Sequence, residues 1–295
     1  MKPPPFTYVD PTGLSEATAL LAAHGDEAKL LAGGQSLVPL LNMRLAQPAV
    51  LIDLNRVAEL NYLREESRDG RPGIAIGAMT RHRSIERDRA VTDRLPLLRE
   101  AIGWVGHPQI RNRGTVGGSI AHADPAAELP LVLVALDGVA TVRSERGTRT
   151  VPAAEFFLYT FTPALEADEV LAEVWLPLPS PGTGQAFVEV ARRHGDFALV
   201  STAVSLTVTA QGRCADARIA VGGAAPVPMR ARAAEAGLAG EDPDDTRLRE
   251  AARVAAGEME PTSDVHADAR YRRDVAETLV YRALAAAGRR ARSDA

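Results

Sequence analysis

Hydrophobic residues near the start of the chain recur in short runs that predict a small α/β unit. The apolar run at residues 29–32 predicts a strand, and the alternation at residues 50–54 predicts a second. Between them, Gly33 and Gly34 form a turn, and Ser36 is placed to cap a helix that runs to about residue 44. The order is therefore strand, glycine turn and helix N-terminus, after an extended N-terminal segment.

The apolar pattern in the middle of the chain predicts further strands and helices. We expect strands at 61–65, 73–78 and 169–176, a hairpin of 139–144 with 149–151, a helix capped by Thr80 that reaches the late eighties, and helices at 95–105 and 125–136. Gly106 and Pro108 close the helix at 95–105, so residues 109–122, which hold a second glycine cluster, are expected to be irregular.

Prolines and glycines concentrated at residues 177–184 form the clearest compositional break in the chain. We expect a first domain at 1–178, with subdomains of about 1–58 and 59–178, and a second domain at 185–290. In the second domain, the apolar pattern predicts a three-stranded antiparallel sheet from 186–192, 200–209 and 214–222. Helices are predicted to follow at 230–238, 245–256 and 268–287. Strands followed by helices indicate an α+β fold.

Composition narrows the possible partners. Of the 295 residues, 46% are hydrophobic and 24% are charged, which is typical of a folded globular protein. The net charge is -4 and the arginines are scattered, so we expect no nucleic-acid partner. The longest apolar run, 129–136, is too short for a membrane span, and no signal peptide is recognisable, so we expect a cytoplasmic location.

Cysteine and histidine usage argues against a metal centre in this chain. The single cysteine, Cys214, excludes an internal disulfide and cannot alone hold an iron-sulfur cluster, which usually takes four thiolates. The six histidines show no H-E-x-x-H pair, and we expect no metal site. Any one-electron metal chemistry must therefore lie in another chain.

Two glycine clusters are the candidate binding elements, residues 32–36 and residues 114–119. Neither has the G-x-G-x-x-G or G-x-x-x-x-G-K-[ST] spacing of the common nucleotide loops. Glycines let a ligand approach backbone N–H groups, and the hydroxyls of Ser36, Thr115 and Ser119 suit a phosphate. The alternative is that both clusters form ordinary tight turns, and spacing alone does not decide between the two.

Longer strings around both clusters carry a resemblance to a known family. Residues 31–45 (LAGGQSLVPLLNMRL) and 110–130 (IRNRGTVGGSIAHADPAAELP), with further matches at 193–198 and 221–230, resemble the FAD-carrying medium subunit of molybdenum hydroxylases. That family includes carbon monoxide dehydrogenase and xanthine dehydrogenase. The resemblance implies the FAD-binding fold of vanillyl-alcohol oxidase, the PCMH type, in two α/β subdomains, followed by the C-terminal domain of this subunit family.

The resemblance also implies roles for individual residues. Two loops would wrap the diphosphate of non-covalently bound FAD: Ala32, Gly33, Gly34, Gln35 and Ser36 in one, and Thr115, Val116, Gly117, Gly118 and Ser119 in the other. Glu128 matches a position, usually aspartate, near the adenosine of FAD. Leu171 matches an apolar position beside the cofactor, and Phe197 an aromatic position next to the isoalloxazine ring. No catalytic acid, base or nucleophile is implied.

Glu189 departs from the family pattern, because several relatives have a lysine there, close to the flavin. An anion at this position is expected to lower the reduction potential of the flavin. Alternatively, Glu189 faces solvent or pairs with Arg192 or Arg193. We assign it no role from the sequence.

The resemblance implies a complex of three chain types, expected as a dimer of heterotrimers. A large subunit would carry molybdopterin, a small subunit two [2Fe-2S] clusters, and this chain FAD, which would pass electrons to NAD, oxygen or a quinone. Two alternatives remain: a self-contained FAD-dependent reductase or oxidase on the same fold, and an assembly subunit without flavin. The substrate would meet molybdenum in another polypeptide, so this sequence does not specify it.

Overall fold

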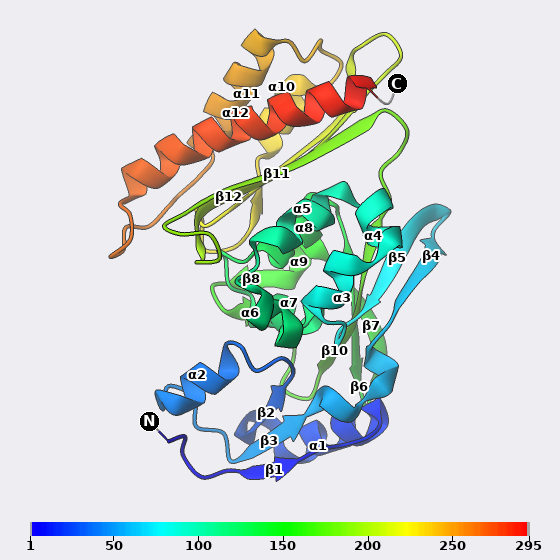
Figure 1. The fold of residues 1–295 in the computed structure, drawn as a ribbon, viewed down its shortest axis with the longest axis vertical. Coiled ribbons are helices and arrows are strands. Elements are labelled where there is room, and N and C mark those ends of the chain that lie inside the picture. Colours follow the sequence, from blue (N-terminus) through cyan, green and yellow to red (C-terminus); the bar gives the residue numbers. More distant parts are fainter. Residues whose placement is uncertain (1, 294–295) are drawn as a thin grey trace.

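The apolar run at Val50–Asp53 forms the centre of a small parallel sheet at one end of the molecule (Figure 1). The computed structural model describes residues 2–293. Strand β3 (Val50–Asp53) pairs with β1 (Thr7–Val9) and β2 (Ala28–Leu31). Helix α1 (Leu14–His24), which the sequence pattern did not predict, packs on this sheet. Short helices η1 (Gly25–Glu27), α2 (Leu37–Asn42), η2 (Leu54–Arg56) and η3 (Ala58–Leu60) complete the unit.

A five-stranded antiparallel sheet lies beyond the small sheet, in the order β4-β5-β10-β6-β7. Its strands are β4 (Leu63–Arg68), β5 (Arg71–Gly77), β6 (Val139–Ser144), β7 (Gly147–Pro152) and β10 (Val170–Pro177). All residues of β10 are buried, because it pairs with β5 on one side and β6 on the other. A separate two-stranded hairpin is formed by β8 (Phe157–Tyr159) and β9 (Thr162–Pro163).

Seven helices of the described chain accompany this sheet: α3 (His82–Arg87), α4 (Arg89–Arg94), α5 (Pro96–Trp104), α6 (Pro108–Arg113), α7 (Val116–His122), α8 (Glu128–Ala135) and α9 (Ala153–Phe156). Every residue of α8 is buried. A helix that is apolar on all sides belongs in the interior. Helix α8 contacts α5 and α7 and also strands of the C-terminal sheet, so it joins the two halves of the molecule.

Two expectations in this region were wrong. Residues 109–122 are not irregular, because Pro108 begins α6 and Thr115 caps α7, its Oγ1 accepting a hydrogen bond from Gly118 N at 3.1 Å. Thr80 does not cap a helix; its hydroxyl donates to the Tyr62 carbonyl, and Arg81 is the N-cap of α3. In the small-sheet unit, Ser36 is the N-cap residue of α2 as expected, although its side chain makes no capping bond.

The C-terminal part is an antiparallel meander covered by helices. The three predicted strands are β11 (Thr183–Ala191), β12 (Ala198–Val208) and β13 (Cys214–Gly222), and a two-residue strand, β14 (Met229–Arg230), extends the sheet. Helices α10 (Arg232–Leu238), α11 (Asp245–Gly257) and α12 (Ala269–Ser293) cover one face, and α5 and α8 cover the other. Among residues 2–293 we find no helix that could cross a membrane.

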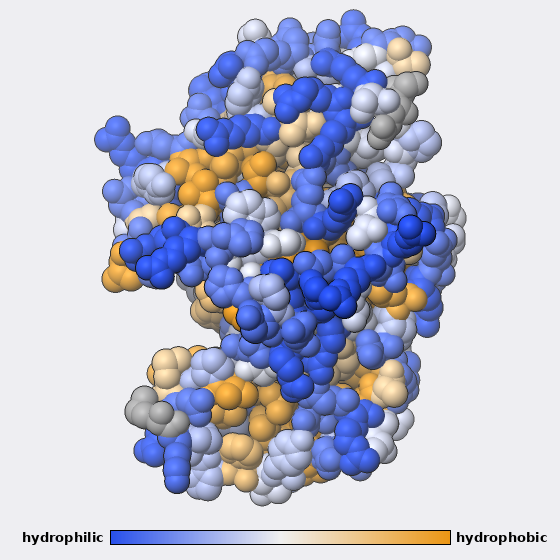
Figure 2. All heavy atoms as spheres, in the orientation of Figure 1, coloured by the Kyte–Doolittle hydropathy of each residue, from blue (hydrophilic) through white to orange (hydrophobic). Residues whose placement is uncertain are grey.

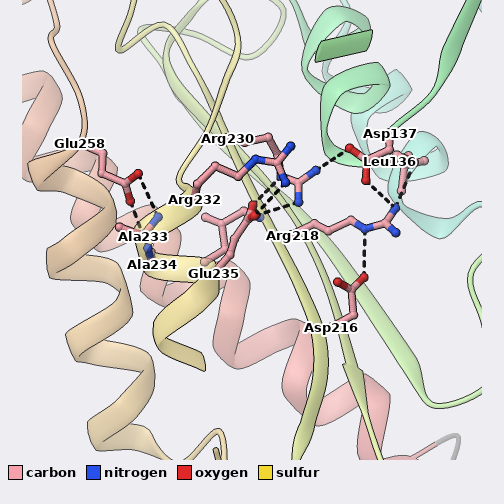
Figure 3. A network of polar contacts seen from close by, with 11 residues as sticks. Leu136, Asp137, Asp216, Arg218, Arg230, Arg232, Ala233, Ala234, Glu235 and Glu258 are labelled. Carbon is pink, nitrogen blue, oxygen red and sulfur yellow. Dashed lines mark hydrogen bonds and ion pairs between the residues drawn. The ribbon is translucent and has the colours of Figure 1, made fainter. Parts of the chain in front are cut away.

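An ion-pair network fastens the end of α8 to the C-terminal sheet (Figure 3). Asp137, just after α8, accepts a hydrogen bond from Arg230 at 2.7 Å and lies 3.3 Å from Arg218. Arg230 also pairs with Glu235 of α10, and Glu235 accepts a hydrogen bond from the Ile219 backbone at 2.8 Å. Because the Arg230 and Glu235 side chains are nearly buried, this network orients the two parts of the chain.

We predict that Arg230→Met destabilises the protein by about 2 to 4 kcal/mol, because Glu235 would stay buried without its main cation. Arg232→Met is the matched control: its side chain also contacts Glu235 but is 61% exposed, so its expected cost is below about 0.5 kcal/mol. Urea unfolding of both variants measures the difference. Equal losses would show that the buried pair does not hold the interface together.

Candidate cofactor site

The two glycine clusters meet in the folded chain. The first loop, residues 32–36, joins β2 to α2, and the second loop, residues 114–119, connects α6 with α7 and includes the start of α7. A Cβ atom added at Gly33 would lie 2.5 Å from the Arg113 carbonyl oxygen and 2.8 Å from Gly114 Cα. Only glycine permits this approach. The space that these glycines leave at the junction is therefore filled by protein backbone, not by a ligand.

Hydrogen bonds made by Arg81 and Asn55 join the same two loops. The Arg81 guanidinium donates to the carbonyl of Arg113, the residue just before the second loop, and to Asn55 Oδ1. The Asn55 amide in turn donates to the Ala32 carbonyl of the first loop at 3.0 Å. One arginine thus fixes the spacing of both loops. Arg81 and Asn55 belong to no sequence motif, and only tertiary structure brings them together.

Positive charge collects at this junction. The pKa of Arg81 is lowered, mainly by burial and further by the charge of Arg113. Asp53 acts on the pKa of Arg81 in the opposite direction, but in the part of the chain that the structure describes neither guanidinium forms an ion pair within 4.0 Å. Two neighbouring cations without a paired anion create a field that favours an anionic ligand.

The first loop offers free hydrogen-bond donors. The backbone N–H groups of Gly33, Gly34, Gln35 and Ser36 donate to no acceptor within residues 2–293. The Ser36 hydroxyl is likewise not used in capping α2. In Figure 2 the molecule is hollowed on the side of α2, between the lobe that carries this helix and the middle of the molecule. Consecutive free N–H groups are suited to the oxygens of a diphosphate.

The backbone of the second loop, by contrast, is already bonded. Val116 N donates to the Thr80 carbonyl at 3.0 Å, and Gly117 N to the Ala78 carbonyl at 2.8 Å. Gly118 N is bonded to Thr115 Oγ1, and Ser119 N to the Thr115 carbonyl. This loop can therefore offer the hydroxyl groups of Thr115 and Ser119, but not these N–H groups. The first loop thus offers backbone donors, whereas the second offers side-chain hydroxyls.

A buried histidine lies beneath the second loop. His82 N donates to the Gly114 carbonyl at 3.0 Å, and the ring of His82 packs against Gly114. Burial is the main cause that lowers the pKa of His82 to about 4, so the ring is neutral at pH 7. The sequence pattern gave no sign of His82, which reaches this loop from the start of α3.

Glu128 and Leu171 both lie in the interior near the second loop. Glu128 begins α8 and is buried, and this burial is the main cause that raises its pKa to about 7. Leu171 precedes Ala172, whose carbonyl accepts from Ala78 N directly below Gly117. These positions are compatible with the expected neighbourhood of the cofactor, and their contacts with it remain predictions.

Phe197 lies on the loop between β11 and β12 and is 63% exposed. The His194 ring of the same loop packs on Trp104 with ring centroids 5.0 Å apart, and Gly195 lies against His107. This contact places the loop at the start of α6, which leads into the second glycine loop. An exposed aromatic ring held in this position is available for stacking on a planar ligand.

Glu189 matches neither alternative that its sequence suggested. It is only 7% exposed, so it does not face solvent, and neither Arg192 nor Arg193 lies within 4.0 Å of its carboxylate in the described chain. Burial, followed by the charge of Glu128, raises the pKa of Glu189 to about 9. Its surroundings thus favour the uncharged form of this carboxyl.

Two family models together match nearly the entire chain. Residues 4–179 match the FAD binding domain in molybdopterin dehydrogenase, and residues 185–287 match the CO dehydrogenase flavoprotein C-terminal domain. A relative from Paenarthrobacter nicotinovorans, the 6-hydroxypseudooxynicotine dehydrogenase complex subunit alpha, is 44% identical and aligns over 99% of this chain and 97% of its own length. The carbon monoxide dehydrogenase medium chain of Hydrogenophaga pseudoflava is 40% identical, over 97% and 98%.

The fold agrees equally well with a solved structure. A chain of carbon monoxide dehydrogenase from Hydrogenophaga pseudoflava, in a form that lacks the Mo-pyranopterin moiety of its cofactor, superposes with a TM-score of 0.94. The two chains are 42% identical, and the match covers 98% of this chain and 99% of that one.

We predict that Gly33→Ala and Gly117→Ala each destabilise the protein by about 1 to 3 kcal/mol through overpacking. A Cβ at Gly117 would lie 2.8 Å from the backbone of Ala78, as close as the contact of Gly33 with Gly114. Gly103→Ala in α5, where an added Cβ meets nothing within 4 Å, is the control and is expected to be neutral or stabilising. Thermal unfolding measures all three, and a Gly33→Ala melting temperature equal to that of Gly103→Ala would contradict the loop contact.

Proposed function

The chain belongs to the family of FAD-binding medium subunits of molybdenum-containing dehydrogenases, and we propose that it passes electrons through FAD from a partner subunit to an external acceptor. It is an oxidoreductase subunit with a flavoprotein fold. Relatives bear the names of medium or alpha subunits, which implies large and small partner chains.

The observation that carries this proposal is the first loop with its free donors. Its backbone N–H groups donate to no acceptor within the described residues, and the guanidinium groups of Arg81 and Arg113, which form no ion pair there, lie beside it. A diphosphate satisfies both features at once. We therefore assign the first loop and the hydroxyls of Thr115 and Ser119 to the diphosphate of non-covalently bound FAD, with Phe197 beside the ring.

The division of chemistry among the chains follows from what this chain lacks. Its one cysteine, Cys214, is buried, and no cluster of metal-ligating side chains occurs among the described residues. Bound FAD supplies the redox chemistry, and the protein contributes binding and orientation. We place molybdopterin in a large partner and the two [2Fe-2S] clusters in a small one, within a cytoplasmic dimer of heterotrimers.

Exposed apolar side chains near the site suit such a partner. Leu158, Tyr159 and Phe161 of the β8–β9 hairpin are all more than half exposed. The Phe161 ring contacts the ring of His122, the last residue of α7, with centroids 5.0 Å apart. Permanent interfaces are apolar at their centre, so this hairpin is a reasonable contact surface close to the second loop.

Substitution of Arg81 tests the FAD assignment. Arg81→Met removes the cation and both hydrogen bonds that join the loops, so we expect FAD to bind roughly tenfold to a hundredfold more weakly. Arg83→Met, in the first turn of α3, removes a cation that pairs with Glu86 and makes no bond to either loop, and is the control. Fluorescence titration with FAD gives both dissociation constants. Unchanged FAD affinity in Arg81→Met would exclude the junction as the diphosphate site.

Dependence on partner chains separates the proposal from its rivals. The purified chain is expected to be yellow with bound FAD and to show no turnover with hydroxylase substrates. Mixed with its large and small partners, it should show substrate-dependent bleaching of flavin absorbance, which stripping FAD abolishes. Turnover by the chain alone would favour a self-contained reductase or oxidase, and a colourless chain that cannot take up FAD would favour an assembly subunit.

A further inference from the structure

The side chain of His82 packs beneath the junction of the two loops. His82 is the first residue of α3, and only 4% of its surface is exposed. A Cβ atom added at Gly114 would lie 2.7 Å from His82 Nδ1 and 2.8 Å from its Cε1. Gly114 in turn meets the first loop, because a Cβ added at Gly33 would lie 2.8 Å from Gly114 Cα. The imidazole ring, the second loop and the first loop are therefore packed in series.

Backbone contacts hold the start of α3 against the second loop. His82 N donates to the Gly114 carbonyl at 3.0 Å. The residue before it, Arg81, forms an isolated β-bridge with Thr115. A displacement of the His82 ring is therefore passed directly to the backbone of the second loop.

The His82 ring is compatible with this position only in its uncharged form. Both Nδ1 and Nε2 are inaccessible to solvent and make no well-formed hydrogen bond within residues 2–293. Burial of a polar group without a partner is costly, and burial of an imidazolium with two N–H donors is more costly still. Burial is accordingly the main cause that lowers the pKa of His82 to about 4. The Thr115 backbone acts in the opposite direction, whereas the charges of Arg111 and Arg81 lower the pKa further.

Carboxylates on α3 and on the helices packed against it, α4, α5 and α6, are engaged elsewhere. Glu86 of α3 lies 3.3 Å from Arg111 of α6. The side chain of Asp88 caps α4, and Glu100 of α5 pairs with Arg290 at 2.7 Å. Among the described residues, no acid contributes to the pKa of His82. A protonated ring would therefore face two guanidinium groups and no counter-charge.

We propose that His82 is a positioning residue for FAD: its neutral ring holds the second loop against the first, and its protonation separates the loops and releases the cofactor. His82 acts through Gly114 and Gly33 and does not itself touch FAD. Because the ring is closed off from solvent, it takes up a proton from water only during a local opening of the loops. The inference rests on the proposed function, because it takes these loops to be the FAD site.

Proton linkage gives the size of the acid effect. In an opened state with the His82 ring in water, its pKa returns to the ordinary value of 6.5, whereas in the closed state it is about 4. The closed state thus binds fewer protons between these two values, so it is favoured above pH 6.5 and loses stability as the pH falls toward 4. Between pH 7.5 and pH 5 the open population should rise about thirtyfold.

The rate of FAD release as a function of pH tests this coupling. Release from the wild-type chain, followed by the recovery of flavin fluorescence on dilution, should be about thirtyfold faster at pH 5 than at pH 7.5. His82→Leu and His82→Gln fill the same space but take up no proton, so their release rates should be nearly independent of pH. Glu128, whose pKa of about 7 lies in the same range, is kept in every variant, so the difference isolates His82.

Truncation of Ile85 separates positioning from a general loss of stability. Ile85 lies one turn after His82 on α3 and is fully buried, so Ile85→Ala weakens the same helix without emptying the space beneath Gly114. At pH 7.5 folded Ile85→Ala should keep wild-type FAD affinity. His82→Ala should bind FAD roughly tenfold more weakly, because the loops are in contact for a smaller fraction of the time. His82→Leu should restore the affinity.

Hydrogen exchange of the chain without FAD gives a second readout. The N–H groups of Val116 and Gly117 are bonded to the carbonyls of Thr80 and Ala78, so they exchange only when the second loop opens. The ratio of their exchange rates in the wild type to those in His82→Leu should be about thirtyfold larger at pH 5 than at pH 7.5.

Equal acid acceleration of FAD release in the wild type and in the two non-titrating variants would overturn the inference. Wild-type FAD affinity in His82→Ala, or an exchange ratio that does not change with pH, would also overturn it. Failure of the wild-type chain to bind FAD at pH 7.5 would instead overturn the proposed function, whatever the exchange of the second loop shows.

Discussion

The contact of Gly33 with the backbone of Arg113 and Gly114 is the constraint on which the rest of the site depends. Gly33 follows a strand of the small parallel sheet, and Gly114 precedes a helix on the large antiparallel sheet, so this contact joins the two subdomains. Arg81 and Asn55 then fix the distance between the loops. A side chain at Gly33 would change the mutual position of the loops before any ligand arrived.

Helix α8 makes two different contacts with the C-terminal sheet at its two ends. At its C-terminal end, Asp137 meets Arg230 and Arg218, and the charges are paired. At its N-terminal end, Glu128 lies near Glu189. Among the described residues, no basic side chain lies within 4.0 Å of either carboxyl group. The paired end accounts for how the two parts of the chain are held together. At the unpaired end, burial raises the pKa of both acids, so their uncharged forms are favoured where the helix begins.

The sequence predicted those features that depend on local pattern. The strands at 50–54, 73–78 and 200–209 were recognisable because apolar residues alternate or run continuously there. Helices α6 and α7 were missed because they are short, and glycines and proline outweigh their apolar spacing. His82 and Arg81 could not be assigned, because their roles arise from contacts across the fold. The glycine loops were identified by resemblance, but their close approach to one another was not.

The groups that suit FAD also weaken the empty chain. The unbonded N–H groups of the first loop and the adjacent cations Arg81 and Arg113 each lack a partner within the described residues. An anionic ligand supplies a partner to both. Because a ligand that binds only the folded state stabilises it, cofactor binding and folding are linked in this subunit. The second loop, whose Val116, Gly117, Gly118 and Ser119 N–H groups are all bonded within the protein, supports the first loop.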